Sequence, residues 1–355
     1  MAFPNISTRL STENRSAWII DMTSDPDPMA AHLAEIARGH IEGATGVTGL
    51  KRLSGGASQE TWSFDATTEG GSIPLILRRA PGGKQGTSAT AVPLETEASL
   101  IDLAGAAGVP VPTVVHVLTP EDELGHGFIM NRIIGETIAR KILRDDEYAR
   151  ARPLLARQCG EILARLHSIG KSSLPALRIS PALAEVDQYL GTYKTHGHPH
   201  PVFDLAFRWL KENAPPETTA FTLVHGDFRN GNLMIGEDGV RAVLDWELAH
   251  IGDPMEDLGW ICVNSWRFGN IDQPVGGFGM REDMFEGYEA AGGAPIDPSR
   301  VKFWEVLGTL KWGIMCTIMA SVFQSGMDRS VERATIGRRS SETEIDLLRL
   351  LAPRA

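Results

Sequence analysis

The chain has 355 residues, of which 42% are hydrophobic and 22% are charged, and its formal net charge at pH 7 is −11. A single hydrophobic core stops growing at about 250 to 300 residues, so this length predicts two lobes. The ordinary composition excludes a disordered or fibrous protein. The negative net charge argues against a nucleic-acid-binding protein, which would carry a basic patch.

The cysteines and the apolar runs bear on localisation. Cys159, Cys262 and Cys316 are far apart in apolar surroundings, which is typical of reduced buried thiols and predicts a cytoplasmic protein. Residues 1–16 are polar and lack the apolar core of a secretory signal. The longest apolar run, residues 312–323, is too short to cross a bilayer, so we expect a buried helix there and no membrane contact.

The N-terminal part of the chain predicts a lobe built on an antiparallel sheet. Residues 1–24 show no apolar period and are assigned to an N-terminal arm. A helix start signal at residues 25–28 opens a helix that we expect to end near Gly43. Short alternating runs at 47–53, 61–64 and 73–79, separated by glycine-rich breaks, are typical of a β-meander.

The first glycine-rich break is a candidate phosphate-binding turn. Gly55, Gly56 and Ser58 lie in this break, where glycines allow backbone N–H groups to approach a phosphate. A glycine pair between two strands is more often only a hairpin turn. Both interpretations stay open at this point.

Charged residues follow at the end of a strand and within the apolar stripe of a helix, where a charge needs a partner. The third strand ends in Arg78 and Arg79, and a guanidinium can pair with phosphate through two hydrogen bonds. We favour Arg78, although Arg79 could take this role. In the helix that begins near residue 93, Glu97 lies within the apolar stripe, so it either pairs with a buried cation or reaches water at the edge of the stripe.

The two lobes are expected to meet near residue 134. Two further strands are predicted at 113–118 and 128–134, and from Gly135 onward the pattern becomes mainly helical. The sequence therefore predicts a first lobe over residues 25–134 and a second over 135–355.

The strongest functional signal lies at residues 223–245. Two short apolar runs enclose a polar loop that contains Asp227, Asn232 follows five positions later, and a further apolar run ends at Asp245. Asp and Asn are common in ordinary turns, so each residue alone would be unremarkable. Oxygen ligands of this kind suit Mg²⁺ bound together with substrate phosphates, and the joint order therefore predicts nucleotide chemistry.

The sequence of this loop resembles that of a known family. His225-Gly226-Asp227, followed by Asn232 and Asp245, resembles the aminoglycoside phosphotransferase and choline kinase-like branch of the kinase-like fold. The resemblance implies an α+β, protein-kinase-like fold of two lobes, with an antiparallel sheet in the first lobe and a larger, mainly helical second lobe. It also implies ATP and Mg²⁺ as cofactors and transfer of the γ-phosphate to a hydroxyl group of a small molecule.

The resemblance assigns roles to individual residues. Asp227 would be the catalytic base, and Asn232 and Asp245 would hold Mg²⁺. Arg78, paired with Glu97, would contact the phosphates. Residues 128–132 would form the hinge, where backbone groups hydrogen-bond the adenine, with Met130 and Arg132 as candidate binding residues. A plain edge strand is the alternative.

Residues around and after the loop complete the predicted site. His225, Asp253 and Asp257 are expected to be structural, with Asp253 capping a helix and Asp257 bonding the loop backbone. The expected acceptor-binding residues are aromatic, basic or amide side chains: Trp260, Asn264, Trp266, Arg267, Lys311 and Trp312.

The acceptor is the least determined part of the prediction. Four segments resemble the subgroup related to the kinase-like domain of acyl-CoA dehydrogenase fusion proteins: Arg78-Arg79-Ala80-Pro81, the hinge at Met130, residues 257–260 and Lys311-Trp312. That resemblance implies a hydroxyacyl-CoA-like or other anionic acceptor. The alternatives are an aminoglycoside or amino-alcohol kinase, or a nucleotide-binding pseudokinase with a regulatory role. The choice between ATP and GTP and the oligomeric state stay open.

Overall fold

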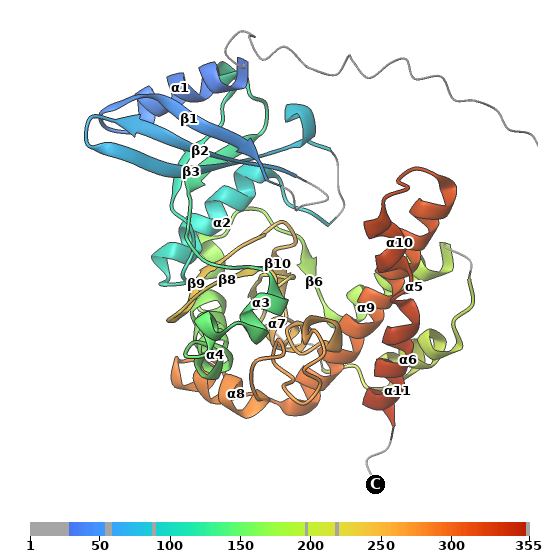
Figure 1. The fold of residues 1–355 in the computed structure, drawn as a ribbon. Helices are drawn as coiled ribbons and strands as arrows, with labels where there is room; N and C mark the ends of the chain where they lie inside the picture. The colour runs from blue at the N-terminus through green and yellow to red at the C-terminus, as the bar shows by residue number, and fades with distance from the viewer. Residues whose placement is uncertain (1–27, 54–58, 87–89, 196–197, 217–219, 353–355) are drawn as a thin grey trace, which may run out of the picture.

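The computed structural model describes residues 28–53, 59–86, 90–195, 198–216 and 220–352 (Figure 1). The expected arm at residues 1–24 lies outside the described residues. So do Gly55, Gly56 and Ser58.

The first lobe is an antiparallel sheet with a helix on one face (Figure 1). The strand order is β1-β2-β3-β5-β4, and every neighbouring pair is antiparallel. The elements of this lobe are α1 (Pro28–His40), β1 (Ala44–Arg52), β2 (Glu60–Thr68), β3 (Gly71–Arg79), α2 (Leu94–Ala106), β4 (Val114–Val117) and β5 (Gly127–Asn131). The predicted antiparallel sheet is confirmed.

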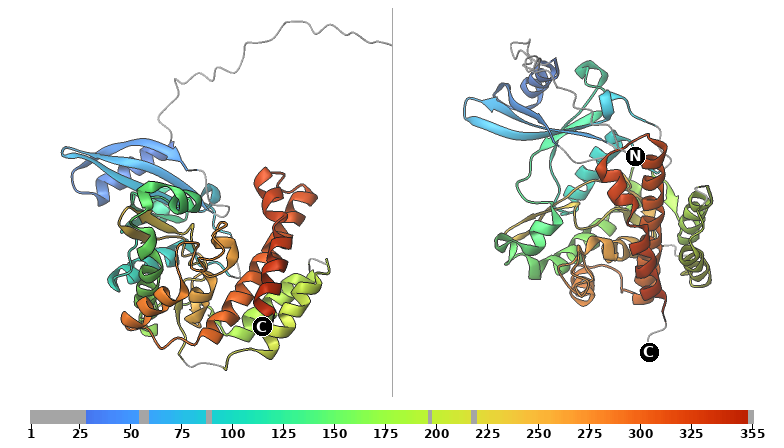
Figure 2. Two further views of the ribbon diagram at one scale, coloured as in Figure 1. Left: turned by 60° about the horizontal axis from the view of Figure 1, so that its bottom comes forward. Right: turned by 45° about the vertical axis from the view of Figure 1, so that its right-hand side comes forward.

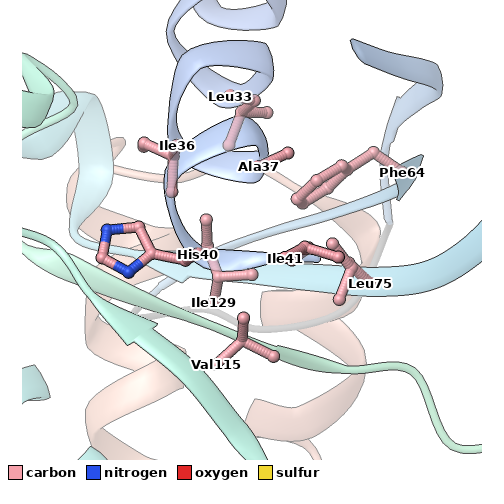
Figure 3. A pocket seen from close by; sticks show the side chains of 9 residues that line it. All are labelled: Leu33, Ile36, Ala37, His40, Ile41, Phe64, Leu75, Val115 and Ile129. Carbon is pink, nitrogen blue, oxygen red and sulfur yellow. The ribbon is translucent and has the colours of Figure 1, made fainter. Parts of the chain in front are cut away.

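Helix α1 covers the sheet because its apolar stripe matches an apolar sheet face. Leu33 and Ile36 pack in one core cluster with Phe64 of β2 and Leu75 of β3. Figure 3 shows these side chains around a small apolar pocket between α1 and the sheet. Burying each such side chain contributes roughly 1.5–3 kcal/mol, so this packing fixes the position of β3, whose end carries Arg78.

The second lobe is mainly helical and contains two small sheets, β6-β10-β7 and β8-β9. Its strands are β6 (Ile179–Ser180), β7 (Thr222–Val224), β8 (Leu233–Gly236), β9 (Gly239–Val243) and β10 (His250–Gly252). Its helices are α3 (Ala139–Arg144), α4 (Arg152–His167), α5 (Ala182–Thr195), α6 (Pro201–Glu212), α7 (Met255–Trp260), α8 (Arg281–Ala290), α9 (Pro298–Ser325), α10 (Val331–Gly337) and α11 (Ser340–Leu351). Short 3₁₀ turns are η1 (Pro81–Gly83), η2 (Pro120–Asp122), η3 (Asp146–Tyr148), η4 (Lys171–Ser173) and η5 (Asn264–Trp266).

Helix α2 joins the two lobes. It precedes the predicted boundary in sequence, yet its buried residues Leu94, Ala98 and Ile101 belong to the same core cluster as Phe228 and Trp246 of the second lobe. The carboxylate of Glu97 on this helix therefore faces the region between the lobes.

Helix α9 is longer than the apolar run at residues 312–323 predicted. Asp297 caps it by accepting a hydrogen bond from the Ser299 N–H at 2.9 Å, and Gly326 ends it in the left-handed conformation. Its length and composition are those of a helix that could cross a membrane, but half of the most apolar stretch is buried inside the protein. Figure 2 shows α10 and α11 beside it. The predicted helix is present, but it begins earlier than expected, and most of the run at residues 312–323 is only half-buried.

Candidate active site

The loop between β7 and β8 carries the predicted base and needs a glycine to form. Gly226 has φ +80°, and a Cβ atom built on it would lie 2.5 Å from the carbonyl oxygen of Leu248. A side chain at this position would be both strained and in collision. The glycine of the His-Gly-Asp motif therefore allows the loop to pass close to the chain that follows Asp245.

The carboxylate of Asp227 is held by donors on both oxygens. Its Oδ1 accepts hydrogen bonds from Arg229 Nε at 3.0 Å and from Trp260 Nε1 at 2.8 Å. Its Oδ2 accepts one from Asn232 Nδ2 at 2.7 Å, so the predicted base and the predicted amide are in direct contact. The contact of Arg229 was not predicted from the sequence, where its place two residues after Asp227 was the only signal.

Asp257 holds the backbone of this loop, as predicted. Its buried carboxylate accepts hydrogen bonds from the N–H groups of His225 at 2.9 Å and Gly226 at 3.0 Å, and it pairs with His167 Nε2 at 3.2 Å. Burial raises the pKa of Asp257, but His167 and the N–H donors outweigh burial and lower it below its usual value.

Asp253 lies at the start of α7, the helix that contains Asp257, and caps it as predicted. It accepts hydrogen bonds from the Met255 N–H at 3.0 Å, from Arg300 Nε at 2.6 Å and from Trp304 Nε1 at 2.9 Å. Helix α7 is therefore fixed at its N-terminus to α9.

His225 is a neutral structural residue. Its Nδ1 accepts a hydrogen bond from the Asp227 N–H at 3.2 Å, and its Nε2 lies 3.2 Å from the carbonyl oxygen of Leu244, to which it donates. Burial lowers the pKa of His225, although nearby carboxylates such as Asp257 oppose this effect. The ring thus joins the loop to the strand that leads to Asp245.

Asp245 follows β9 in an unusual backbone conformation. Its φ is +69°, a left-handed value that non-glycine residues seldom adopt and that costs about 1–3 kcal/mol. The N–H of Leu244 donates to the backbone carbonyl of Asn232 at 2.9 Å, so the two predicted metal ligands are neighbours. The conformation directs the carboxylate of Asp245 toward the first lobe, where it accepts a hydrogen bond from Arg78 Nη2 at 2.5 Å.

The predicted pair of Arg78 and Glu97 is present. Arg78 Nε lies 3.1 Å from Glu97 Oε1, and the Glu97 side chain is almost fully buried. Burial raises the pKa of Glu97 to about 7, and the charge of Arg78 opposes this effect. Arg79 instead donates to Glu60 at 2.8 Å, so of the two arginines Arg78 is the one that contacts Asp245.

The hinge strand requires one correction. Met130 is half-buried against the main core. The guanidinium of Arg132 bonds Asp65 at 2.6 Å and Ser63, and its backbone N–H donates to the carbonyl of Pro74 at 2.9 Å. Arg132 is therefore committed to the sheet of the first lobe, and we withdraw it as a nucleotide-binding side chain.

The donor set fits a hard divalent cation. Nδ2 of Asn232 is committed to Asp227, which leaves the amide oxygen to face a cation, and Asp245 contributes a carboxylate. Both are oxygen ligands of the kind that Mg²⁺ prefers, and Mg²⁺ completes its shell with water and substrate phosphates. Among the described residues no group of three or more His, Cys, Asp or Glu side chains could hold a metal alone. Two oxygen ligands from the protein leave the other positions around Mg²⁺ to water and substrate phosphates.

Aromatic rings and cations extend from Asp227 along one side of the loop. The ring of Trp260 lies 5.3 Å from that of Trp266, which lies 4.9 Å from that of Trp312. Arg229 stacks over Trp266 and Lys311 over Trp260, each at 4.7 Å from the ring centroid. The structure thus brings four of the predicted acceptor-binding residues together and adds Arg229.

The other two predicted acceptor-binding residues have different partners. Arg267 donates to Glu305 at 2.8 Å and to the backbone carbonyl of Cys262 at 2.6 Å, within a buried network. Asn264 donates to Asp346 of α11 at 2.9 Å. Both side chains tie the segment after α7 to the helices behind it, and Arg267 is corrected to a structural residue.

Comparison with known proteins places the chain in a family. The family model described as "Phosphotransferase enzyme family" matches residues 49–304. The probable acyl-CoA dehydrogenase IBR3 of Arabidopsis thaliana is 28% identical over 316 residues, which are 80% of this chain but 38% of that protein. Acyl-CoA dehydrogenase family member 11 of Gallus gallus is 27% identical over 66% of this chain and 30% of that protein. The chain thus spans well under half the length of these curated relatives.

Solved structures share the fold at low sequence identity. A candidate aminoglycoside phosphotransferase of Ralstonia eutropha superposes with a TM-score of 0.71 at 22% identity, covering 90% of this chain and 97% of that one. A choline/ethanolamine kinase family protein of Mesorhizobium loti gives a TM-score of 0.61 at 20% identity, covering 91% and 94%. These structures confirm the predicted kinase-like α+β fold of two lobes. The family match over most of the sequence shows that the chain belongs to the phosphotransferase enzyme family.

Proposed function

We propose that this protein transfers the γ-phosphate of magnesium-bound ATP to a hydroxyl group of a small molecule, with Asp227 as the general base. One observation carries the proposal: Asp227, Asn232 and Asp245 meet between β7 and the end of β9, and Arg78 of the first lobe faces them. A structure of aminoglycoside phosphotransferase APH(4)-Ia with the same fold, TM-score 0.59, contains AMP-PNP and hygromycin B, which supports ATP as the donor.

The residues act mainly by positioning, as phosphoryl transfer requires. Asp227 accepts the proton of the acceptor hydroxyl as its oxygen attacks the γ-phosphorus. Asn232 and Asp245 would hold Mg²⁺, which supplies positive charge to the phosphate oxygens when bound. Arg78, oriented by Glu97, adds a permanent cation on the side of the first lobe.

The surroundings of Asp227 favour an anionic acceptor. Arg229 and Lys311 place two cations over the aromatic rings beside the base. A polycationic aminoglycoside would meet like charges here, whereas a hydroxyacyl-CoA-like compound or another anionic alcohol would meet cations.

The proposal is tested by magnesium-dependent ADP release from ATP in a panel of acceptors. The panel contains hydroxyacyl-CoA compounds, hydroxy acids, amino alcohols and aminoglycosides. The key variant is Asp227→Ala, and its matched control is Asp238→Ala, which removes an exposed carboxylate from the neighbouring β8-β9 turn.

We expect one class of anionic alcohol to stimulate ADP release by the wild type and by Asp238→Ala, and Asp227→Ala to lose about 10²-fold to 10⁴-fold in kcat. If only an amino alcohol or aminoglycoside stimulates ADP release, the proposed anionic acceptor is wrong, but the proposed kinase activity stands. Nucleotide binding without stimulation by any acceptor would favour the regulatory pseudokinase. Full activity of Asp227→Ala would overturn the proposed mechanism.

A further inference from the structure

We propose that Trp260 is a positioning residue for the base, orienting Asp227 so that its Oδ2 atom faces the acceptor hydroxyl. The inference rests on the proposed role of Asp227. The indole Nε1 of Trp260 donates to Asp227 Oδ1 at 2.8 Å, and the Trp260 side chain is only 5% exposed. A residue that was expected to bind the acceptor is instead bonded directly to the proposed base.

Helix α7 provides the geometry for this contact. Asp257 and Trp260 are three residues apart and therefore lie on the same helix face. From this face Asp257 accepts hydrogen bonds from the loop backbone at His225 and Gly226. Trp260 donates one to the side chain of Asp227. One short helix thus fixes both the path of the loop and the orientation of its carboxylate.

Helix α9 fixes the indole ring from the other side. A Cβ atom built on Gly308 would lie 2.8 Å from Cε3 of Trp260, so only a glycine allows α9 to approach the ring this closely. Lys311, three residues later on the same face of α9, places its ammonium 4.7 Å from the ring centroid. With Trp266 packed at 5.3 Å, the ring has little room to rotate.

The contacts distinguish the two oxygens of Asp227. An ionised carboxylate offers about four lone-pair sites, two on each oxygen. Trp260 and Arg229 use both sites on Oδ1, whereas Asn232 uses one on Oδ2. The proton of the acceptor hydroxyl is therefore transferred to Oδ2. The freed oxygen forms the new bond to the γ-phosphorus, the bond to the bridging oxygen breaks, and ADP leaves.

The bond itself can be tested without an acceptor by NMR of the indole N–H groups. The chain has eight tryptophans, and the Trp260 signal is identified by its loss in Trp260→Phe. We expect Asp227→Asn to shift this signal while leaving that of Trp304 in place. Asp253→Asn is the matched control and should shift only the Trp304 signal, because Trp304 donates to Asp253 at 2.9 Å. A Trp260 signal unmoved by Asp227→Asn would overturn the inference.

Kinetics test the functional consequence in the full chain with the most stimulating acceptor of the panel. We expect Trp260→Phe to lower kcat about tenfold, within the contribution of a general base, and to leave the KM for ATP unchanged.

Two further variants separate this role from simple packing. Replacing Trp260 by β-(3-benzothienyl)alanine keeps the ring size and removes only the N–H donor, and it should reproduce the effect of Trp260→Phe. Trp304→Phe removes a comparable buried indole and should leave kcat in place. If Asp227→Ala is inactive while both Trp260 replacements keep the wild-type kcat, the positioning role is wrong and the proposed function stands. If Asp227→Ala is active, the proposed function itself fails.

Discussion

Asp227 and Asp245 carry the same carboxylate, but their surroundings prepare them for different tasks. Within the described parts of the chain, the donors to Asp227 are Arg229, Asn232 and Trp260, all of the second lobe, so these contacts do not depend on the position of the first lobe. The carboxylate of Asp245 bonds Arg78 across the lobes. The contacts of Asp227 suit a base that must keep one orientation. The contact of Asp245 with Arg78 suits a carboxylate that can exchange this arginine for a metal ion.

Arg78 should not be replaceable by lysine. Its guanidinium contacts Glu97 through Nε at 3.1 Å and Asp245 through Nη2 at 2.5 Å, and a single ammonium cannot reproduce this fork. Loss of one charge-assisted hydrogen bond costs about 1.5–3 kcal/mol, so Arg78→Lys should raise the KM for ATP at least about tenfold. Steady-state kinetics with Arg79→Lys provide the control, because Arg79 pairs with Glu60 instead. Equal effects of the two substitutions would contradict the assignment.

The neutral ring of His225 predicts a specific dependence of stability on pH. Its pKa is lowered in the folded protein, mainly by burial, so the unfolded chain takes up a proton near pH 6.5 that the folded protein does not. The free energy of unfolding should therefore be highest above about pH 6.5 and fall below it, by up to about 1.4 kcal/mol for each pH unit that separates the pKa of His225 in the unfolded and folded protein.

Urea unfolding of wild type and His225→Gln at pH 7 and pH 5 measures this contribution. The variant should lose less stability between the two pH values, because glutamine does not titrate. His250, whose pKa is raised by Glu256 against the effect of burial, is present in both proteins and cancels in the comparison. An identical loss in the two proteins would show that His225 does not titrate as argued.

At the scale of elements, α7 links the catalytic loop to the body of the second lobe. The N–H groups of His225 and Gly226 donate to the carboxylate of Asp257. In Asp257→Asn an amide NH₂ group would replace one of the accepting oxygens. With buried N–H groups left unsatisfied at about 1–3 kcal/mol each, we expect a loss of roughly 3 kcal/mol in the free energy of unfolding and a larger fall in kcat than in ATP affinity. Denaturant unfolding and steady-state kinetics measure the two effects.

Asp253→Asn is the matched control for this helix. Asp253 also accepts three hydrogen bonds, but none comes from the catalytic loop. It should therefore cost stability with little loss of kcat in the remaining folded protein. If both variants lose kcat equally, the loop is not positioned by Asp257 specifically.

The sequence predicted the elements best where a single period or a fixed order of residues determined them. Strands β1 to β5 and the order of Asp227, Asn232 and Asp245 were predictable because alternation and spacing are local properties. The full length of α9 was not, because Glu305 and Lys311 interrupt the apolar pattern yet are buried with charged or aromatic partners. The bond from Trp260 to Asp227 joins residues 33 positions apart and has no local signal.

At the scale of the whole molecule, the two lobes are joined by polar contacts around Asp245. Besides the pair of Arg78 and Asp245, Glu97 accepts a hydrogen bond from the Trp246 N–H at 3.3 Å, and the Val92 N–H donates to the Glu247 carbonyl at 2.8 Å. Any ligand that binds Asp245 therefore acts on the link between the lobes. This coupling could not be predicted from the sequence, because it depends on how β3, α2 and the end of β9 meet in space.

Binding of magnesium and nucleotide should accordingly stabilise the whole molecule in a manner that depends on Asp245. At a free concentration of 100 Kd, a ligand that binds only the folded protein adds about 2.7 kcal/mol to the free energy of unfolding. We expect Mg²⁺ with ADP to raise the Tm of the wild type well above the value with ADP and EDTA. Asp245→Asn should lose this magnesium-dependent increment but keep the smaller one produced by ADP alone, because Arg78 is still present to contact the phosphates. If Asp245→Asn shows the full magnesium-dependent rise in Tm, Asp245 is not a ligand of the metal. The proposal that its carboxylate exchanges Arg78 for the cation would then be wrong as well.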